Sequence, residues 1–322
     1  MSNYKKISNN IQQLIIDNPV TPIEKLTWID IKNPRKKEIQ FLRKKFNFSL
    51  PHLQASSAKA VAQRPVIEKG EDYTFVTLHF PIFKGDNITA GEIEFFIGSD
   101  YLITLHNGDV KTLNKFFKLS RKDSDSLKSY QFESSTVLLY EIIEKLLLEC
   151  FSLLDKNSIA ISELEETIFS QKSRRAVTEI LQLRRNIINT RKIMQNHKNI
   201  IKKLVTLQTG FVPEQTVRKY YNELLDHSKR FWEYLDTQKE MIEVLNNTNE
   251  SLLNYRLSDI MKTLTIFSVI VFPLTLLAAI FGMNTTKSMP LINHPYGFWI
   301  LLSFMAVGCL GMLVFFFKKK WL

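Results

Sequence analysis

Two long uncharged stretches near the C-terminus constrain this 322-residue chain more than any other feature. Residues 263–286 contain no Asp, Glu, Lys or Arg, and neither do residues 296–317. Each stretch has the ~20 residues that a helix rising 1.5 Å per residue needs to cross a hydrocarbon core of ~30 Å. A buried helix hairpin of a soluble protein is the alternative, but two adjacent runs of this length without a charge are rare in soluble cores. The sequence therefore predicts an integral membrane protein with two transmembrane helices.

Positive charges flank both stretches on the same side. Lys262 precedes the first stretch, and Lys318, Lys319 and Lys320 follow the second, whereas the connecting segment 285–295 carries only Lys287 and one histidine. The excess of Lys near membrane helices marks the cytosolic side. We therefore expect a multi-pass protein of the plasma (inner) membrane, with both termini cytosolic and a basic ring of these lysines where the helices meet lipid headgroups. The N-terminal ten residues have no apolar core of the signal-peptide type.

The remainder of the chain predicts an α+β cytosolic domain with a long stalk helix, followed by an all-helical membrane part. Strands are expected at 26–31, 73–83, 92–97 and 101–106, because these runs are rich in β-branched and aromatic residues. A helix is expected to open at Asn33-Pro34 and to run through Phe46. The expected divisions are an α/β domain over 1–130, a helical hairpin region over 131–210, a stalk and first membrane helix over 213–281, an outer loop over 282–295, a second membrane helix over 296–317 and a basic tail over 318–322.

The chain has a formal net charge of +11, and much of it lies in one segment. Residues 171–203 hold ten Lys or Arg against the single acid Glu179. A nucleic-acid surface would interleave stacking aromatic residues, and these are absent here. We therefore expect no nucleic-acid partner, and instead a solvated helical face near anionic lipid or an acidic neighbouring helix. No Gly-rich phosphate loop, nucleophile elbow or zinc-spaced histidine pair occurs, so the sequence predicts neither an enzyme nor an organic cofactor.

A heptad-like stripe runs along the segment that precedes the first membrane stretch. Val217, Leu224, Phe231, Gln238 and Leu245 recur every seven residues, and no Gly or Pro interrupts the chain between Pro213 and Pro273. A helix from about Glu214 through Phe281 would be ~100 Å long. Such a helix cannot bury its apolar stripe alone, so the pattern predicts helical partners and an oligomer.

Small and hydroxylated residues continue this spacing into the membrane segment. At ~100° per residue they share an arc of about 100°: Ser258, Met261, Thr265, Ser268, Phe272, Thr275 and Ala279. Close helix packing, or hydroxyl groups bonded back to helix carbonyls, explains such a face as well as a pore does. The face carries no carboxylate, so any cation passing along it would keep most of its water. Mg²⁺ suits such a path because it gives up its water reluctantly.

The end of the first membrane stretch, Phe281-Gly282-Met283-Asn284, resembles the CorA family of magnesium transporters. The context extends the resemblance to nearly the whole chain, through MKTLT at 261–265, PLT at 273–275, LTWIDIKNP at 26–34 and YNELLDH at 221–227. The resemblance implies a homopentamer that conducts hydrated Mg²⁺, with Co²⁺ and Ni²⁺ as further substrates. It implies a selectivity filter at Gly282, Met283 and Asn284, and it places pore residues at Met261, Leu264, Thr275 and Asn284.

The resemblance also implies regulation by cytosolic Mg²⁺, because relatives bind Mg²⁺ between subunits and close. Glu223 matches a regulatory acid of the family, and Glu71, Asp72 and Asp226 are looser candidates. Isolated exposed acids are the alternative for all four. The outer loop contains Lys287 and reads Met289-Pro290-Leu291, where many relatives have an acid, so cation recruitment should be weaker here. Transport of another divalent ion such as Zn²⁺, and a membrane-anchored scaffold or sensor, stay open as alternative functions.

Overall fold

A computed structural model describes residues 3–17, 25–56, 65–122, 134–170, 173–208, 214–283, 290, 294–319 and 321. The chain divides into two compact units, Met1–Leu245 and Asn246–Leu322. The first unit contains a sheet and helices, and the second contains helices only.

A seven-stranded sheet organises the first unit. Its strand order is β1-β2-β3-β7-β6-β5-β4, and only the central β3–β7 pair is parallel. The strands are β1 (Asn3–Lys6), β2 (Ile11–Asp17), β3 (Lys25–Lys32), β4 (Val66–Lys69), β5 (Thr74–Lys84), β6 (Asn87–Ile97) and β7 (Tyr101–His106). The predicted strands are confirmed, including the β6–β7 hairpin, whose Gly98 N–H donates to the Tyr101 carbonyl at 3.0 Å. β1, β2 and β4 were not predicted.

Helices cover both faces of this sheet, because successive side chains of a strand point to opposite sides. On one face Ile29 and Ile31 pack with Leu42 of α1 (Lys36–Phe46) and Leu53 of α2 (Leu50–Ala55). On the other face the Trp28 ring meets Phe117 of α3 (Lys111–Lys122) edge-on, with 4.8 Å between ring centroids. The result is an α/β/α sandwich with a fully buried centre.

Helix α1 begins later than the sequence predicted. Asn33 has a left-handed φ of 50°, and its N–H donates to the His106 carbonyl, so it extends the β3–β7 pairing instead of capping the helix. The N-cap is Arg35, whose N–H donates to the Glu38 carboxylate at 2.9 Å. This contact is one half of a capping box, and it fixes the N-cap two residues beyond Asn33.

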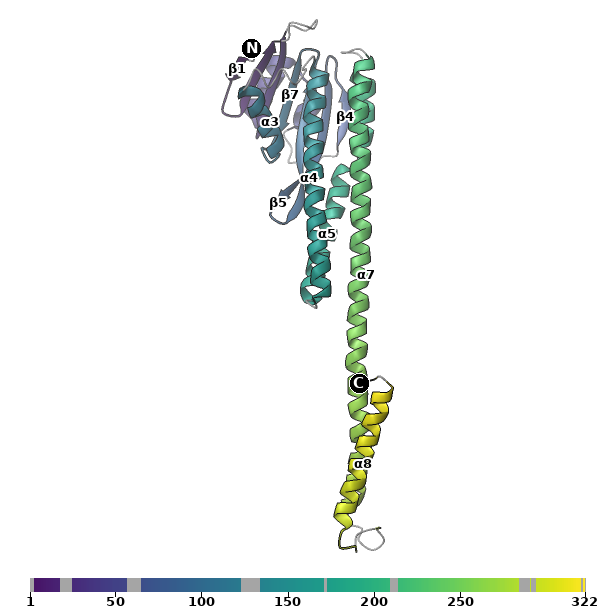
Figure 1. Ribbon diagram of the computed structural model, residues 1–322. Coiled ribbons are helices and arrows are strands. Elements are labelled where there is room, and N and C mark those ends of the chain that lie inside the picture. Colours follow the sequence, from purple (N-terminus) through teal and green to yellow (C-terminus); the bar gives the residue numbers. More distant parts are fainter. Residues whose placement is uncertain are drawn as a thin grey trace. The chain divides into compact units, whose positions relative to one another are not determined.

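The next four helices follow α3 along the chain, and α4 and α7 are the longest of them (Figure 1). They are α4 (Ser135–Phe169), α5 (Ser173–Met194), α6 (His197–Gln208) and α7 (Glu214–Phe281). Within the first unit α4 runs parallel to α7, since the Tyr221 hydroxyl donates to the Thr136 carbonyl and Asn157 donates to Gln238. The heptad-like positions Leu224, Phe231 and Leu245 of α7 are buried, as the stripe predicted.

The second unit consists of the C-terminal part of α7 and of α8 (Gly297–Lys318). Both helices are long and apolar enough to cross a membrane. On α7, buried or half-buried side chains recur every three or four residues at Lys262, Ile266, Ile270, Leu274, Leu277 and Phe281. On α8 they recur at Gly297, Leu301, Met305, Cys309, Met312 and Phe316. The two helices run side by side (Figure 1), and these stripes are their least exposed sides, so we take them as the faces through which the helices pack.

Candidate functional site: a polar stripe on α7 and a carboxylate–histidine cluster

The stripe of small and hydroxylated residues lies on the side of α7 that α8 leaves uncovered. Its members Ser258, Met261, Thr265, Phe272, Thr275 and Ala279 are exposed, and Ser268 is half-exposed. Leu264 beside it is also exposed. At ~100° per residue, the middle of this stripe lies about 160° around the helix from the middle of the face that packs on α8. The second unit therefore presents the stripe to whatever surrounds it.

The hydroxyl groups of the stripe share one hydrogen-bonding pattern. Thr265, Ser268 and Thr275 each donate to the carbonyl four residues earlier, at 2.7, 2.9 and 2.9 Å. This is the back-bonding that the sequence left open as one explanation of the face. Because each proton is engaged by the helix, the oxygen lone pairs remain as acceptors. The stripe thus offers neutral acceptors and no charge, which suits contact with the water molecules of a cation.

The predicted filter lies where α7 ends. The Gly282 N–H donates to the Ala278 carbonyl at 2.9 Å, the Met283 N–H donates to the Ile280 carbonyl at 3.3 Å, and Met283 is exposed. A side chain at Gly282 would meet the Ala278 carbonyl oxygen at 3.1 Å, so glycine eases this turn. Asn284 lies outside the described residues. Of the predicted basic ring, Lys262 is half-exposed and Lys318 and Lys319 are exposed, while Lys320 is outside the described part.

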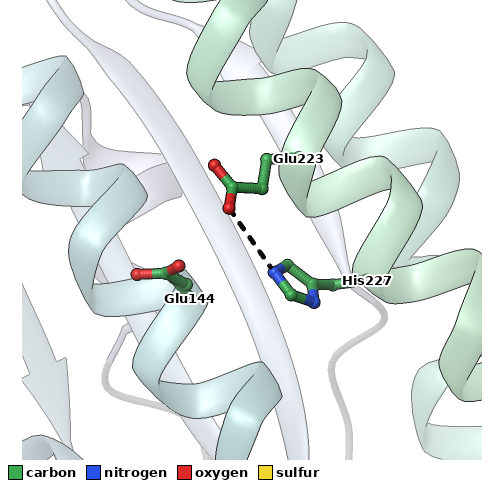
Figure 2. Close-up of side chains that lie close together, drawn as sticks. All are labelled: Glu144, Glu223 and His227. Atoms are coloured by element: carbon green, nitrogen blue, oxygen red, sulfur yellow. Dashed lines mark ion pairs between the residues drawn. The ribbon is translucent and has the colours of Figure 1, made fainter.

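A second group of side chains gathers between α4 and α7 in the first unit (Figure 2). Glu144 of α4 faces Glu223 and His227 of α7, and one ligand atom from each lies within 4.8 Å of the others. His227 Nε2 is 3.9 Å from Glu223 Oε1, and the Arg230 guanidinium donates to His227 Nδ1 at 3.4 Å. With Nδ1 accepting this bond, the neutral ring carries its proton on Nε2, the atom that faces Glu223, and a metal ion bound at Nε2 would displace that proton. Two carboxylates and one imidazole form a donor set that a divalent metal ion can use.

Tyr140 ties the two carboxylates together. Its hydroxyl oxygen is 2.9 Å from Glu223 Oε2 and 3.2 Å from Glu144 Oε1, so its one proton can be donated to either. Burial, followed by the neighbouring Glu144 charge, raises the pKa of Glu141 on the same helix turn to about 7. The charges of Glu144 and Glu223 add to the effect of burial on this pKa, so negative charge at the cluster contributes to the shift. A bound cation would offset that charge.

Comparisons with known proteins match most of the chain. The family model described as "CorA-like Mg²⁺ transporter protein" matches residues 24–320. The chain belongs to this family. A curated CorA-family relative, the "Putative metal ion transporter YfjQ" of Bacillus subtilis, is 27% identical over 314 residues, which cover 96% of this chain and 95% of the relative. The "Cobalt/magnesium transport protein CorA" of Methanocaldococcus jannaschii is 26% identical over 301 residues, with 92% of each chain covered.

A solved structure shows that the fold, too, is that of the CorA family. The complete CorA magnesium transporter structure from Methanocaldococcus jannaschii matches with a TM-score of 0.83 at 22% identity, covering 98% of this chain and 100% of that chain. The relatives named here are transporters, and membership makes this chain a CorA-family transporter of divalent cations.

The regulatory acids predicted from the CorA resemblance are separated in the chain described here. Glu223 lies in the cluster with Glu144 and His227, whereas Asp226 is exposed on α7. Glu71 and Asp72 are exposed in the turn between β4 and β5, at the rim of an open hollow that Tyr73 and Tyr101 also line. Among the described residues, neither acid belongs to a group of three close ligand-type side chains.

Sequence reasoning missed two members of the cluster. His227 lies four residues after Glu223, a spacing that places both on one helix face and that was available as a signal. Glu144 is separated from them by about eighty residues of sequence, and only the packing of α4 on α7 brings it there.

Proposed function

We propose that this chain is a channel-like transporter that conducts Mg²⁺ down its electrochemical gradient, with Co²⁺ and Ni²⁺ as further substrates. The observation that carries the proposal is the exposed, uncharged polar stripe of α7, which faces away from α8. In a ring of copies with α8 on the outside, the α7 stripes line the axis. The helix itself satisfies the hydroxyl protons, but their oxygen lone pairs gain partners only from water or neighbouring helices, because lipid offers no donor.

The ion passes this stripe in hydrated form. The stripe offers hydroxyl oxygens at Thr265, Ser268 and Thr275, and its members include no carboxylate that would compete with the first water shell. Asn284, directly after Gly282 and Met283, is the selectivity residue of this proposal. A ring of neutral amide oxygens accepts hydrogen bonds from the polarised water molecules of Mg²⁺ without displacing them. If Asn284 only capped the helix, its replacement would leave transport intact.

Five copies form the transporter, as the CorA resemblance implies. Both termini are cytosolic, because lysines flank each membrane helix on the side opposite the short connecting loop. Lys262 and Lys318–Lys319 then lie at the headgroup boundary, where positive side chains also attract anionic lipids.

Cytosolic Mg²⁺ closes the transporter through the cluster at Glu223. Bound cation neutralises carboxylates that otherwise repel one another, so it favours the state in which they are close. The cluster supports this assignment because Tyr140 already shares its proton between Glu144 and Glu223. His227 adds a nitrogen ligand, which suits Co²⁺ and Ni²⁺ better than Mg²⁺. Glu71, Asp72 and Asp226 are the further acids proposed to contribute across subunit interfaces.

Metal flux into proteoliposomes tests the proposal. Purified protein reconstituted around a Mg²⁺-sensitive dye should produce a rise in internal Mg²⁺ that depends on the imposed gradient. A membrane-anchored scaffold would give no flux of any metal. A transporter for Zn²⁺ would give flux that excess Mg²⁺ does not inhibit, so competition between Mg²⁺, Co²⁺, Ni²⁺ and Zn²⁺ in the same vesicles separates these ions.

A further inference from the structure

The outward face of α4 carries three exposed apolar side chains, Leu148, Ile159 and Phe169, among serines and acids. Positions 148, 152, 155, 159, 162, 166 and 169 alternate spacings of four and three residues, and all are exposed. At ~100° per residue they share an arc of about 100°. Ile159 and Phe169 are each 61% exposed, and Leu148 is 43% exposed. The seven positions thus form one exposed helix face that is partly apolar and partly acidic.

The neighbouring helix α5 carries an exposed face that is partly apolar and partly basic. Val177, Leu181 and Ile188 are exposed, and Arg184 lies between the last two on the same side. These four positions share an arc of about 60°. The opposite side of α5 is buried in its own chain through Ala176, Ile180, Leu183 and Ile187.

The two outward faces have opposite charge. Between residues 148 and 169, the exposed charged side chains of α4 are five acids and one lysine: Glu149, Asp155, Glu163, Glu165, Glu166 and Lys156. The exposed charged side chains of α5 are all basic: Arg174, Arg175, Arg184, Arg185 and Lys192. Glu179 of α5 is half-exposed and pairs with Arg175 at 2.6 Å. Each face therefore complements the other, in charge as well as in its apolar side chains.

The hairpin geometry sets the height of each residue along the helices. α5 begins at Ser173, four residues after α4 ends at Phe169, and the two helices contact each other, so they are antiparallel. Residues equally far from the turn share a height, which to within one residue pairs Ser162 with Leu181, Ile159 with Arg184 and Glu166 with Val177. In a ring of copies whose axis is parallel to these helices, a residue has the same height in every copy, so the pairs also hold between neighbouring copies.

At matched heights the charges of the two faces fall within about one helical turn of each other. Glu166 lies at the height of Val177, three residues from Arg174. Asp155 lies at the height of Ile188, three residues from Arg185. Glu163 lies at the height of Ile180, four residues from Arg184. The apolar residues also interleave, because Ile159 falls between Leu181 and Ile188.

We infer that the outward face of α4 in one copy docks on the outward face of α5 in the next copy of this chain. One chain carries both halves, so the contact is of the head-to-tail kind that closes into a ring. The contact gives the basic segment 171–203, which contains α5, a defined partner in the acidic face of α4. Salt would weaken this contact, because it screens the charges. This interface rests on the oligomer of the proposed function.

Disulfide trapping between two differently tagged full-length chains tests the contact. Both chains carry Cys150→Ala and Cys309→Ala, which remove the native cysteines. One chain then carries Ser162→Cys and the other Leu181→Cys, two positions at the same height. When the two are co-expressed in membranes, we expect an oxidised species that contains both tags. A matched control replaces Ser162→Cys with Leu119→Cys on α3, because Leu119 is exposed like Ser162 but lies outside the proposed interface.

The charges are tested in the same assay. Arg184→Glu with Arg185→Glu in the Leu181→Cys chain should reduce trapping, and Glu163→Arg with Glu166→Arg in the other chain should restore it. Equal trapping by the control pair, or trapping that charge reversal does not change, overturns the interface. The mass of the untrapped protein in detergent separates two failures. An intact oligomer without trapping refutes this contact alone, whereas a monomer refutes the assembly on which the proposed function also depends.

Discussion

Glu94 should destabilise the first unit at neutral pH, and Glu94→Gln should therefore stabilise it. The carboxyl is buried on β6, and its Oε1 has no hydrogen-bond partner among the described residues. Burial raises the pKa of Glu94 from 4.5 to about 8, the Ser56 hydrogen bond lowers it, and the Glu92 charge raises it further. The folded protein thus holds this proton at a pH where the unfolded chain has released it.

The magnitude follows from that difference in proton binding. Between pH 4.5 and 8 the folded state binds more protons at Glu94, so the free energy of unfolding falls as the pH rises, by at most about 1.4 kcal/mol per unit. At pH 7 the accumulated loss is about 3 kcal/mol, and at pH 5 it is under about 1 kcal/mol. Glutamine keeps the shape of the side chain without the titration. Glu94→Gln should therefore raise Tm at pH 7 by roughly 5–10 °C and have little effect at pH 5.

Glu92 is the matched control, because it lies two residues away on the same face of β6 with the opposite expectation. Its carboxylate is 2.8 Å from His79 Nε2, and both side chains are buried. Glu92→Gln weakens that contact and should lower stability by about 1–3 kcal/mol. Thermal unfolding in detergent from pH 5 to pH 8 measures both variants. If Glu94→Gln lowers Tm at pH 7, or shifts it equally at pH 5 and pH 7, the assignment of a buried neutral carboxyl is wrong.

Three further predictions concern the cluster and the topology. Glu223→Ala with Asp226→Ala should leave transport less inhibited by cytosolic Mg²⁺, and unchanged inhibition would remove both residues from the sensor. Glu144→Ala should relieve inhibition by Co²⁺ at least as strongly as inhibition by Mg²⁺, whereas Glu149→Ala, an exposed acid on the same helix, should change neither. A protease-accessible tag after Leu322 should be protected in intact cells, and its external cleavage would contradict cytosolic termini.

The membrane helices and the long helix were predictable because their signals are local. A run of about 20 uncharged residues has few alternatives to a membrane span. The absence of Gly and Pro between Pro213 and Pro273 leaves no breaking point, and α7 is continuous from Glu214 to Phe281. Pro273 does not end the helix, which continues for two more turns.

The N-terminal strands carried no comparable signal. β2 reads IQQLIID, and its buried residues Ile11, Leu14 and Ile16 follow neither strict alternation nor helical spacing. β1 is four residues long and lies at the sheet edge. β2 owes its place to pairing with β3, and β1 owes its place to pairing with β2; neither contact has a local signature.

The carboxylate–histidine cluster was predictable only in the part that lies on one helix. Glu223 and His227 share a helix face, whereas Glu144 arrives through tertiary packing. The α7 stripe was predictable as one face, but its orientation away from α8 required the burial pattern of both helices. Periodicity places residues on a face, and only packing decides what that face meets.

Mg²⁺ flux through the Asn284→Ala variant tests the central claim most directly. The variant and the unchanged protein are reconstituted at equal density, after oligomer mass and membrane insertion are shown to match. We predict that Asn284→Ala loses Mg²⁺ uptake, because the ring of amide acceptors for the hydrated ion is gone, and that Asn284→Asp retains uptake with altered preference among Mg²⁺, Co²⁺ and Ni²⁺. Near-normal uptake with unchanged metal preference in a correctly assembled Asn284→Ala protein would reduce this residue to a helix cap and contradict the proposed path.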